Sequence, residues 1–134
     1  MRLHHIGIAS NNIQEAIERH KALFGLRQVT SVVEDPVHKV SAVLLSDARG
    51  VFIELIAPLT DDSPVSNILK KGISLYHVCY LVENLDETLK KIRRKAVVIS
   101  KPAPAKLYGG RRVAFVYTLD NYVVEFLEEK IRDA

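Results

Sequence analysis

Hydrophobic and polar positions along this chain follow one order of elements, and that order occurs twice. Residues 3–9 alternate as a half-buried strand does, and residues 75–81 repeat the pattern. Apolar residues at helical spacing follow in both places, over 13–24 and 85–94. Alternating or β-branched runs complete each copy. The pattern therefore predicts one βαβββ module used twice.

The turn and capping residues set the predicted boundaries. Asn11 or Asn12 is expected to cap the first helix, and Gly25 to end it. Strands are predicted at 29–33, 39–45 and 51–56 in the first copy, and at 75–82, 97–100, 112–117 and 122–127 in the second. Ser63 and Pro64 predict the start of a short helix over 65–71. Residues 130–134 are expected to fray.

A chain of 134 residues has the length of one domain, so the two copies must share an interface. We expect an α+β fold and a single domain over 1–134. Within it, module one spans 1–59, a linker with the short helix spans 60–74, and module two spans 75–129.

Composition narrows the classes of function. The 48% hydrophobic and 26% charged residues are ordinary for a globular protein, and no apolar run is long enough for a membrane span. The single cysteine, Cys79, fits a reducing compartment, and we expect a cytoplasmic protein. The net charge of +3 could attract an acidic substrate, but the scattered basic residues do not favour nucleic acid binding.

Each copy holds a histidine near its start and a glutamate near its end. His5 and His77 are 72 positions apart, and Glu54 and Glu125 are 71 apart. Strand periodicity places His5 on the face of Leu3 and Gly7, with His4 on the opposite face. Both glutamates lie between apolar strand residues, where a buried carboxylate needs a cation or hydrogen-bond donors.

Two imidazoles and two carboxylates, one of each per copy, predict a divalent metal site with positions left for water or substrate. Zinc, nickel, cobalt and manganese tolerate such ligands, and the second carboxylate argues against the iron triad of oxygenases. Taken singly, each histidine fits an ordinary core position and Glu54 an edge position facing solvent. The joint placement of all four in one repeat favours metal binding.

With these features the chain resembles the vicinal oxygen chelate superfamily, which contains glyoxalases, bleomycin-resistance proteins and methylmalonyl-CoA epimerases. The resemblance implies a cupped mixed sheet around a metal held by His5, Glu54, His77 and Glu125. The segments 5–9 and 54–64, the short helix and residues 108–115 resemble methylmalonyl-CoA epimerases most. The short turn at 117–121 and the His, Glu, His, Glu order are closer to glyoxalase I, the lactoylglutathione lyase.

The resemblance implies a metal-dependent epimerase or isomerase that removes a proton next to a carbonyl, with Glu125 or Glu54 as the base. Glyoxalase I activity and a non-catalytic, drug-sequestering protein are the alternatives. An acyl-CoA or another anionic carbonyl compound is the expected substrate. Many relatives dimerise, so we expect a homodimer.

A basic, glycine-containing loop could bind the anionic end of such a substrate. The candidate residues are Lys106, Tyr108, Gly109, Gly110, Arg111 and Arg112. The same loop fits solvated charges beside a turn that requires glycine. Cys79 shares the face of His77, where it could either border the cavity or fill the core.

Overall fold

The computed structural model describes residues 1–131, in which three α-helices accompany a ten-stranded sheet. The elements in chain order are β1 (Arg2–Ala9), α1 (Ile13–Phe24), β2 (Arg27–Gln28), β3 (Val33–Asp35), β4 (Val40–Ser46), β5 (Phe52–Pro58), α2 (Pro64–Lys70), β6 (Leu75–Val82), α3 (Leu85–Ile92), β7 (Ala96–Val98), β8 (Ala103–Pro104), the 3₁₀ turn η1 (Lys106–Tyr108), β9 (Arg112–Thr118) and β10 (Val123–Glu128). No helix of this part of the chain has the length and apolar character to cross a membrane. The predicted frayed end lies partly outside the described residues.

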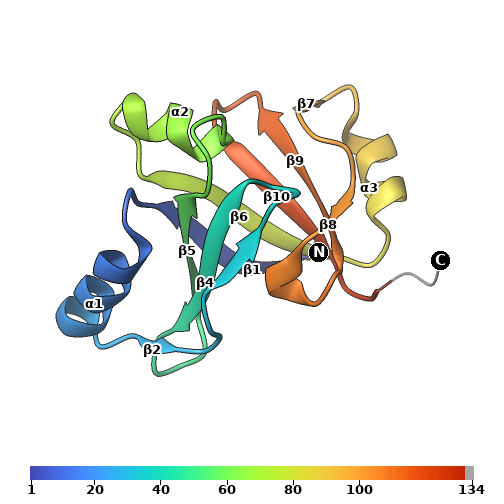
Figure 1. The fold of residues 1–134 in the computed structure, drawn as a ribbon. Helices are drawn as coiled ribbons and strands as arrows, with labels where there is room; N and C mark the ends of the chain where they lie inside the picture. The colour runs from blue at the N-terminus through green and yellow to red at the C-terminus, as the bar shows by residue number, and fades with distance from the viewer. Residues whose placement is uncertain (132–134) are drawn as a thin grey trace.

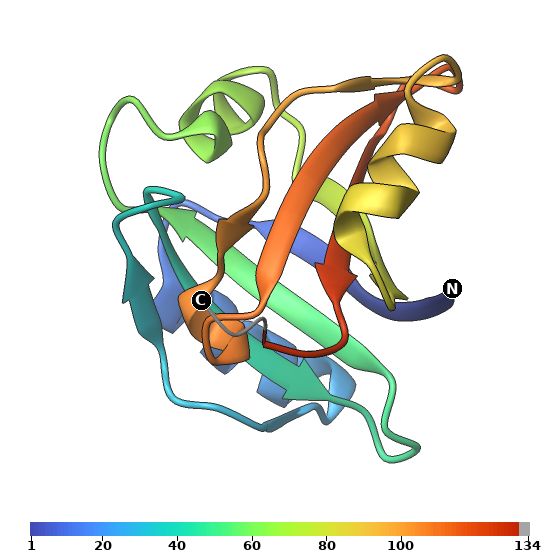
Figure 2. The same ribbon diagram turned by 90° about the vertical axis from the view of Figure 1, so that its right-hand side faces the viewer.

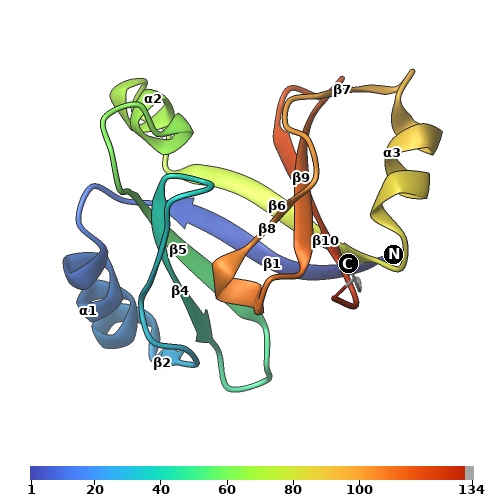
Figure 3. The same cartoon turned by 45° about the vertical axis from the view of Figure 1, so that its right-hand side comes forward.

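The sheet is built outwards from an antiparallel pair, β1 and β6 (Figure 1). Its strand order is β2-β4-β5-β1-β6-β10-β9-β7, with β3 on β4 and β8 on β9. On each side of the central pair the first neighbour runs parallel, β5 to β1 and β10 to β6. The two halves form the walls of an open cup, best seen in Figure 3. The predicted α+β, cupped mixed sheet is confirmed.

Helices cover the outside of the cup, one on each wall (Figures 2 and 3). Ala16 and Ile17 of α1 pack on Val43, Leu45 and Leu55. Leu85 of α3 packs in the same manner on a cluster from β9 and β10. Asn12 and Asn84 cap the two helices by accepting a backbone N–H at 3.1 Å each. Because strand side chains alternate, the intervening residues of these strands face the inside of the cup.

The predicted strands at 29–33 and 97–100 are wrong in a related way, because the chain leaves the sheet at 29–32, between β2 and β3, and at 99–102, between β7 and β8. The side chain of Thr30 accepts the N–H of Leu44 at 3.1 Å, and Ser100 accepts that of Phe115 at 2.9 Å. A hydroxyl thus replaces a backbone carbonyl in the ladder, and four residues, 29–32, lie opposite two on β4. After this break the first copy continues as β3 and the second as β8, followed by η1. The sequence did not predict β8 or η1.

Asp35 ties the two walls together at the end of β3. Its carboxylate is 5% exposed and accepts the N–H groups of Val37, His38 and Lys106 at 3.0 to 3.1 Å. Burial alone would raise the pKa of Asp35, but these donors and the His38 ring lower it below its ordinary value. Because Lys106 begins η1, this one carboxylate fixes η1 against the β3–β4 turn.

Gly7 allows the two halves of the sheet to approach at the centre. It lies opposite His77 in the β1–β6 register. A Cβ at this position would stand 2.6 Å from both ring nitrogens of His77 and closer still to its Cε1. The His77 ring therefore lies over the bare backbone of Gly7.

We expect Gly7→Ala to lower the free energy of unfolding by about 1–3 kcal/mol, because the added methyl displaces a buried ring in a packed centre. Urea unfolding measures the change, with Leu3→Ala on the exposed part of the same strand as the control. An unaltered urea midpoint in Gly7→Ala would contradict this close approach.

We expect Asp35→Asn to lower the free energy of unfolding by about 1–3 kcal/mol at pH 7, because an amide nitrogen faces backbone donors. Because the pKa of Asp35 is lower in the folded protein, its ionised carboxylate stabilises the fold at pH values above the unfolded-state pKa, about 3.9. This contribution is lost as the pH falls through the folded-state pKa. The difference between the two proteins should therefore shrink below about pH 4. Urea unfolding at pH 7, 5 and 3 measures this difference, with the exposed Asp61→Asn as control. A difference between wild type and Asp35→Asn that stayed constant with pH would refute the stabilising role of the ionised Asp35.

Candidate metal centre

Four buried side chains converge at the bottom of the cup, one from each of four adjacent strands. His5 comes from β1, Glu54 from β5, His77 from β6 and Glu125 from β10, and each is at most 4% exposed. One ligand atom from each lies within 4.8 Å of the others. The structure therefore brings together all four residues predicted as metal ligands.

The sheet register explains this convergence. Glu54 pairs with Gly7, two positions after His5, and Glu125 pairs with Cys79, two positions after His77. Residues two apart on a strand share a face, so each glutamate points to the same side as the histidine of its neighbouring strand. The central β1–β6 pair then joins the two histidine–glutamate sets.

The separations between these atoms suit ligands of one small cation. The two Nε2 atoms of His5 and His77 lie 3.0 Å apart, and Glu125 Oε1 is 3.0 and 3.2 Å from them. Glu54 stands further off, at 3.5 Å from His5 Nε2 and 3.7 Å from His77 Nε2. Two ligands about 2.1 Å from one ion lie about 3.0 Å apart at right angles and about 3.4 Å apart in a tetrahedron.

The electrostatics of the cluster also suit a cation. Burial and the neighbouring Glu125 raise the pKa of Glu54. Burial opposes ionisation of Glu125 as well, but the two histidines lower its pKa. Glu125 Oε1 and His77 Nδ1 are buried with no hydrogen-bond partner among residues 1–131. Two carboxylates buried side by side repel each other, and a divalent ion would supply the missing positive charge.

Tyr108 touches the cluster directly, a contact that the sequence did not indicate. Its hydroxyl donates to Glu54 Oε2 at 2.5 Å and lies 3.1 Å from Nδ1 of His5. The Tyr108 ring also stacks on the His5 ring. Burial raises the pKa of Tyr108 well above its ordinary value, so the phenol keeps its proton. The hydroxyl then accepts the His5 Nδ1–H, which leaves the Nε2 lone pair facing the cluster.

His4 was predicted to face away from His5, and this prediction is wrong. A register shift between Leu3 and His5 interrupts the alternation of β1. The ring of His4 consequently lies 5.3 Å from that of Tyr108, and its Nδ1 is 2.8 Å from Nδ1 of His5. Burial lowers the pKa of His4 to about 4, so the ring beside His5 is neutral near neutral pH.

His4, His5 and Cys79 form a second converging group, but its chemistry suits a metal less well. Cys79 is fully buried among apolar side chains such as Leu44 and Leu127. This burial raises the pKa of its thiol, which disfavours the thiolate that a metal requires. Cys79 therefore fills the core, one of its two expected roles.

The predicted anion-binding loop is mostly turned away from the cavity. Arg112 donates to Glu128 at 3.0 and 3.1 Å and to Asp86 at 3.0 Å, and Arg111 donates to the carbonyl of Tyr108 at 3.2 Å. Gly109 and Gly110 both have positive φ in the turn after η1. Of the six candidates, Tyr108 is the one that lines the cavity, together with Glu54 and Glu125. The substrate-binding role of Lys106, Gly109, Gly110, Arg111 and Arg112 stays a prediction.

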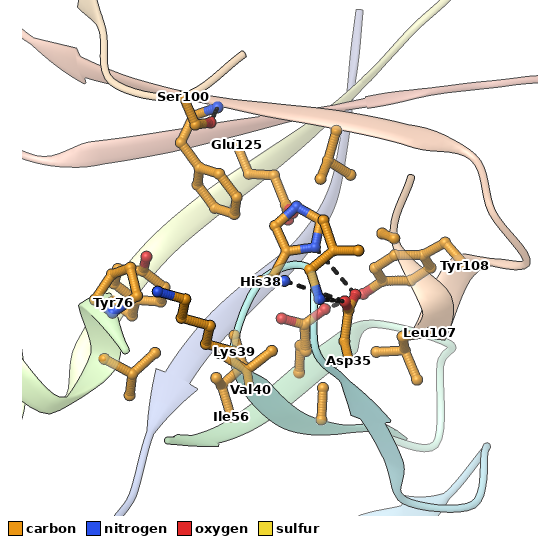
Figure 4. Close-up of a pocket in the computed structure, with 18 of the residues that line it drawn as sticks. Asp35, His38, Lys39, Val40, Ile56, Tyr76, Ser100, Leu107, Tyr108 and Glu125 are labelled. Atoms are coloured by element: carbon orange, nitrogen blue, oxygen red, sulfur yellow. Dashed lines mark hydrogen bonds and ion pairs between the residues drawn. The ribbon is translucent and has the colours of Figure 1, made fainter. Parts of the chain in front are cut away.

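The cavity above the cluster has a volume of about 460 Å³ and mainly apolar walls (Figure 4). Val40 and Ile56 line one side, and Leu107 and Phe115 come from the other half of the chain. The two glutamates of the cluster open into it. This is the size and character of a site for a small organic molecule with a few polar anchors.

Comparison with known proteins agrees with the fold and the site. A profile of the Glyoxalase/Bleomycin resistance protein/Dioxygenase superfamily matches residues 4–115. The mitochondrial methylmalonyl-CoA epimerase of Dictyostelium discoideum is 33% identical over 133 residues, 96% of this chain and 78% of that protein. The lactoylglutathione lyase of Escherichia coli O157:H7 is 24% identical over 97% of this chain and 94% of its own.

The fold is shared with the solved structure of another methylmalonyl-CoA epimerase. The crystal structure of methylmalonyl-CoA epimerase from Mycobacterium tuberculosis superimposes with a TM-score of 0.83 at 21% identity, over 96% of this chain and 88% of that chain. The predicted resemblance is therefore confirmed, and the relatives named here are enzymes. By sequence and by fold, the chain belongs to the Glyoxalase/Bleomycin resistance protein/Dioxygenase superfamily.

Proposed function

We propose that this protein is a metal-dependent epimerase of an acyl-CoA thioester of the methylmalonyl-CoA type. The observation that supports it best is the buried set of two histidines and two glutamates, whose ligand atoms lie within 4.8 Å of one another beneath an apolar cavity. The 33% identity to a methylmalonyl-CoA epimerase over nearly the whole chain supports the reaction type and the substrate class.

The four clustered residues would hold the ion. When bound, a divalent ion such as Zn, Ni, Co or Mn acts as a Lewis acid that stabilises negative charge developing on a carbonyl oxygen. Tyr108 orients the ligands, because it holds both Glu54 and His5 in place. The ligand types alone do not select one of these four metals, because all of them bind imidazole and carboxylate ligands.

Glu125 is the better candidate for the base that removes the α proton. Its Oε1 atom lies 3.0 and 3.2 Å from the two imidazoles, whereas Glu54 Oε2 is held by the Tyr108 hydroxyl. Both carboxylates line the cavity. Loss of the proton leaves an electron pair on the α carbon that delocalises into the thioester carbonyl, and apolar walls protect the resulting enolate from water.

Two other functions fit the same fold. A lactoylglutathione lyase also moves a proton next to a carbonyl, and the 24% identity to such an enzyme supports it less strongly. A non-catalytic binding protein would use the apolar cavity without needing four clustered ligands. The homodimer and the cytoplasmic location stay predictions.

We expect the purified protein to bind one divalent ion per chain, and His77→Ala and Glu125→Gln to lose most of it, because each removes a ligand. Elemental analysis after dialysis against zinc or cobalt measures the content. Arg112→Gln, which alters a side chain bound to Glu128 and Asp86, is the control and should retain the ion. Full metal content in both ligand variants would contradict the proposed site.

We expect the metal-loaded protein to convert one stereoisomer of methylmalonyl-CoA into the other, with deuterium from D₂O entering the α carbon of the product. Mass spectrometry and a chiral assay follow the two events, and Glu125→Gln should lower the rate about 10²–10⁴-fold. Turnover of the glutathione hemithioacetal of methylglyoxal without any epimerisation would favour the lyase. Binding of both compounds without turnover would favour the non-catalytic protein.

A further inference from the structure

The cavity contains a second titratable pair, Asp35 and His38, which lies outside the metal cluster. Both residues line the cavity, and His38 Nδ1 is 3.0 Å from Asp35 Oδ2. Asp35 ends β3 and His38 lies in the turn between β3 and β4, on the opposite half of the chain from Glu125 on β10. Figure 4 shows the His38 ring standing in the pocket with its contact to Asp35 dashed.

The contact with Asp35 determines which His38 nitrogen can react. Asp35 accepts backbone N–H groups at both oxygens, and these donors keep its pKa lowered, so it is an acceptor only. His38 Nδ1 must then carry the hydrogen of the shared bond. Nε2 is left to exchange a proton with whatever occupies the cavity. An aspartate that holds an imidazole in this tautomer is a common arrangement for acid–base catalysis.

Phe115 lies in ring contact with both His38 and the His77 of the metal cluster. The centroid of its ring lies 5.6 Å from that of His77 and 6.3 Å from that of His38. His38 is therefore one aromatic ring away from the cluster and not part of it. In Figure 4 the nitrogen that does not contact Asp35 is turned to the side of the pocket on which Glu125 lies.

The other polar groups of the cavity are less suited to exchange a proton with a substrate. Lys39 is paired with Asp62 at 2.5 Å, and Ser100 accepts the backbone N–H of Phe115. Burial raises the pKa of Tyr76 to about 12, so it keeps its proton near neutral pH. Histidine is the side chain that both gives and accepts a proton in this range.

We propose that His38, held by Asp35, is the catalytic acid and base on the face of the substrate opposite Glu125. This assignment rests on the proposed epimerase function. In one direction the bond between the α carbon and its hydrogen breaks and the proton passes to the Glu125 carboxylate. The electron pair then takes a proton from His38 Nε2 on the other face, which inverts the centre. Exchange of protons with water restores both residues, and the reverse reaction interchanges their roles.

The test separates inversion from simple proton exchange. We incubate each stereoisomer of methylmalonyl-CoA in D₂O with metal-loaded wild type, His38→Gln and Asp35→Asn. In His38→Gln we expect epimerisation to fall about 10²-fold or more. For the stereoisomer whose hydrogen faces Glu125, exchange with deuterium should continue with retention of configuration. Asp35→Asn should shift the ratio of exchange to epimerisation in the same direction but less, because Asp35 acts on the substrate only through the His38 ring.

Metal content of each variant shows that the cluster is intact, and His20→Gln on α1, outside the cavity, is the matched control. Epimerisation by His38→Gln within about 3-fold of wild type would overturn the assignment. Equal loss of deuterium exchange for both stereoisomers would overturn it in favour of a structural role of His38. A rise in KM at constant kcat would overturn it in favour of a role in substrate binding. Absence of epimerisation and exchange in the wild type would instead overturn the proposed function, and this assignment with it.

Discussion

Two carboxylates buried against each other beside two imidazoles form the constraint on which this structure depends. Glu54 and Glu125 are each 4% exposed, and neither can ionise in an apolar sheet without compensation. The histidines next to Glu125 and the Tyr108 hydroxyl on Glu54 supply part of this compensation, and a bound cation would supply the rest. A packed apolar sheet surrounds the cluster, so the four side chains are held at ligand spacing by the backbone.

The duplicated frame explains why much of this could be predicted from the sequence. Alternation and helix caps placed β1, α1, β6 and α3, the last predicted two residues too long, and the repeat placed both histidine–glutamate sets on matching strands. Strand periodicity failed at His4, because a register shift in β1 reverses its side chain. It failed again at Thr30 and Ser100, where a hydroxyl replaces a backbone partner. Neither event alters the spacing of hydrophobic residues, so no periodic signal reports it.

The residues that the sequence could not assign lie where the two modules diverge. After the shared break at Thr30 and Ser100, the first half continues through β3 to the turn that holds His38. The second half continues through β8 to η1 and Tyr108. The Asp35 carboxylate joins the two by accepting the N–H of Lys106 at 3.1 Å. The repeat thus builds the metal centre symmetrically, while its unequal segments shape the cavity and provide different groups on its two sides.

Anomalous diffraction from crystals grown with cobalt or zinc tests the central claim most directly, because it locates the ion without reference to activity. We expect one strong peak between His5 Nε2, His77 Nε2 and the carboxylates of Glu54 and Glu125, within about 2.0–2.3 Å of each ligand atom. A fully loaded crystal with no peak there, or with the four side chains hydrogen-bonded to one another around ordered water, would contradict a metal centre in this protein.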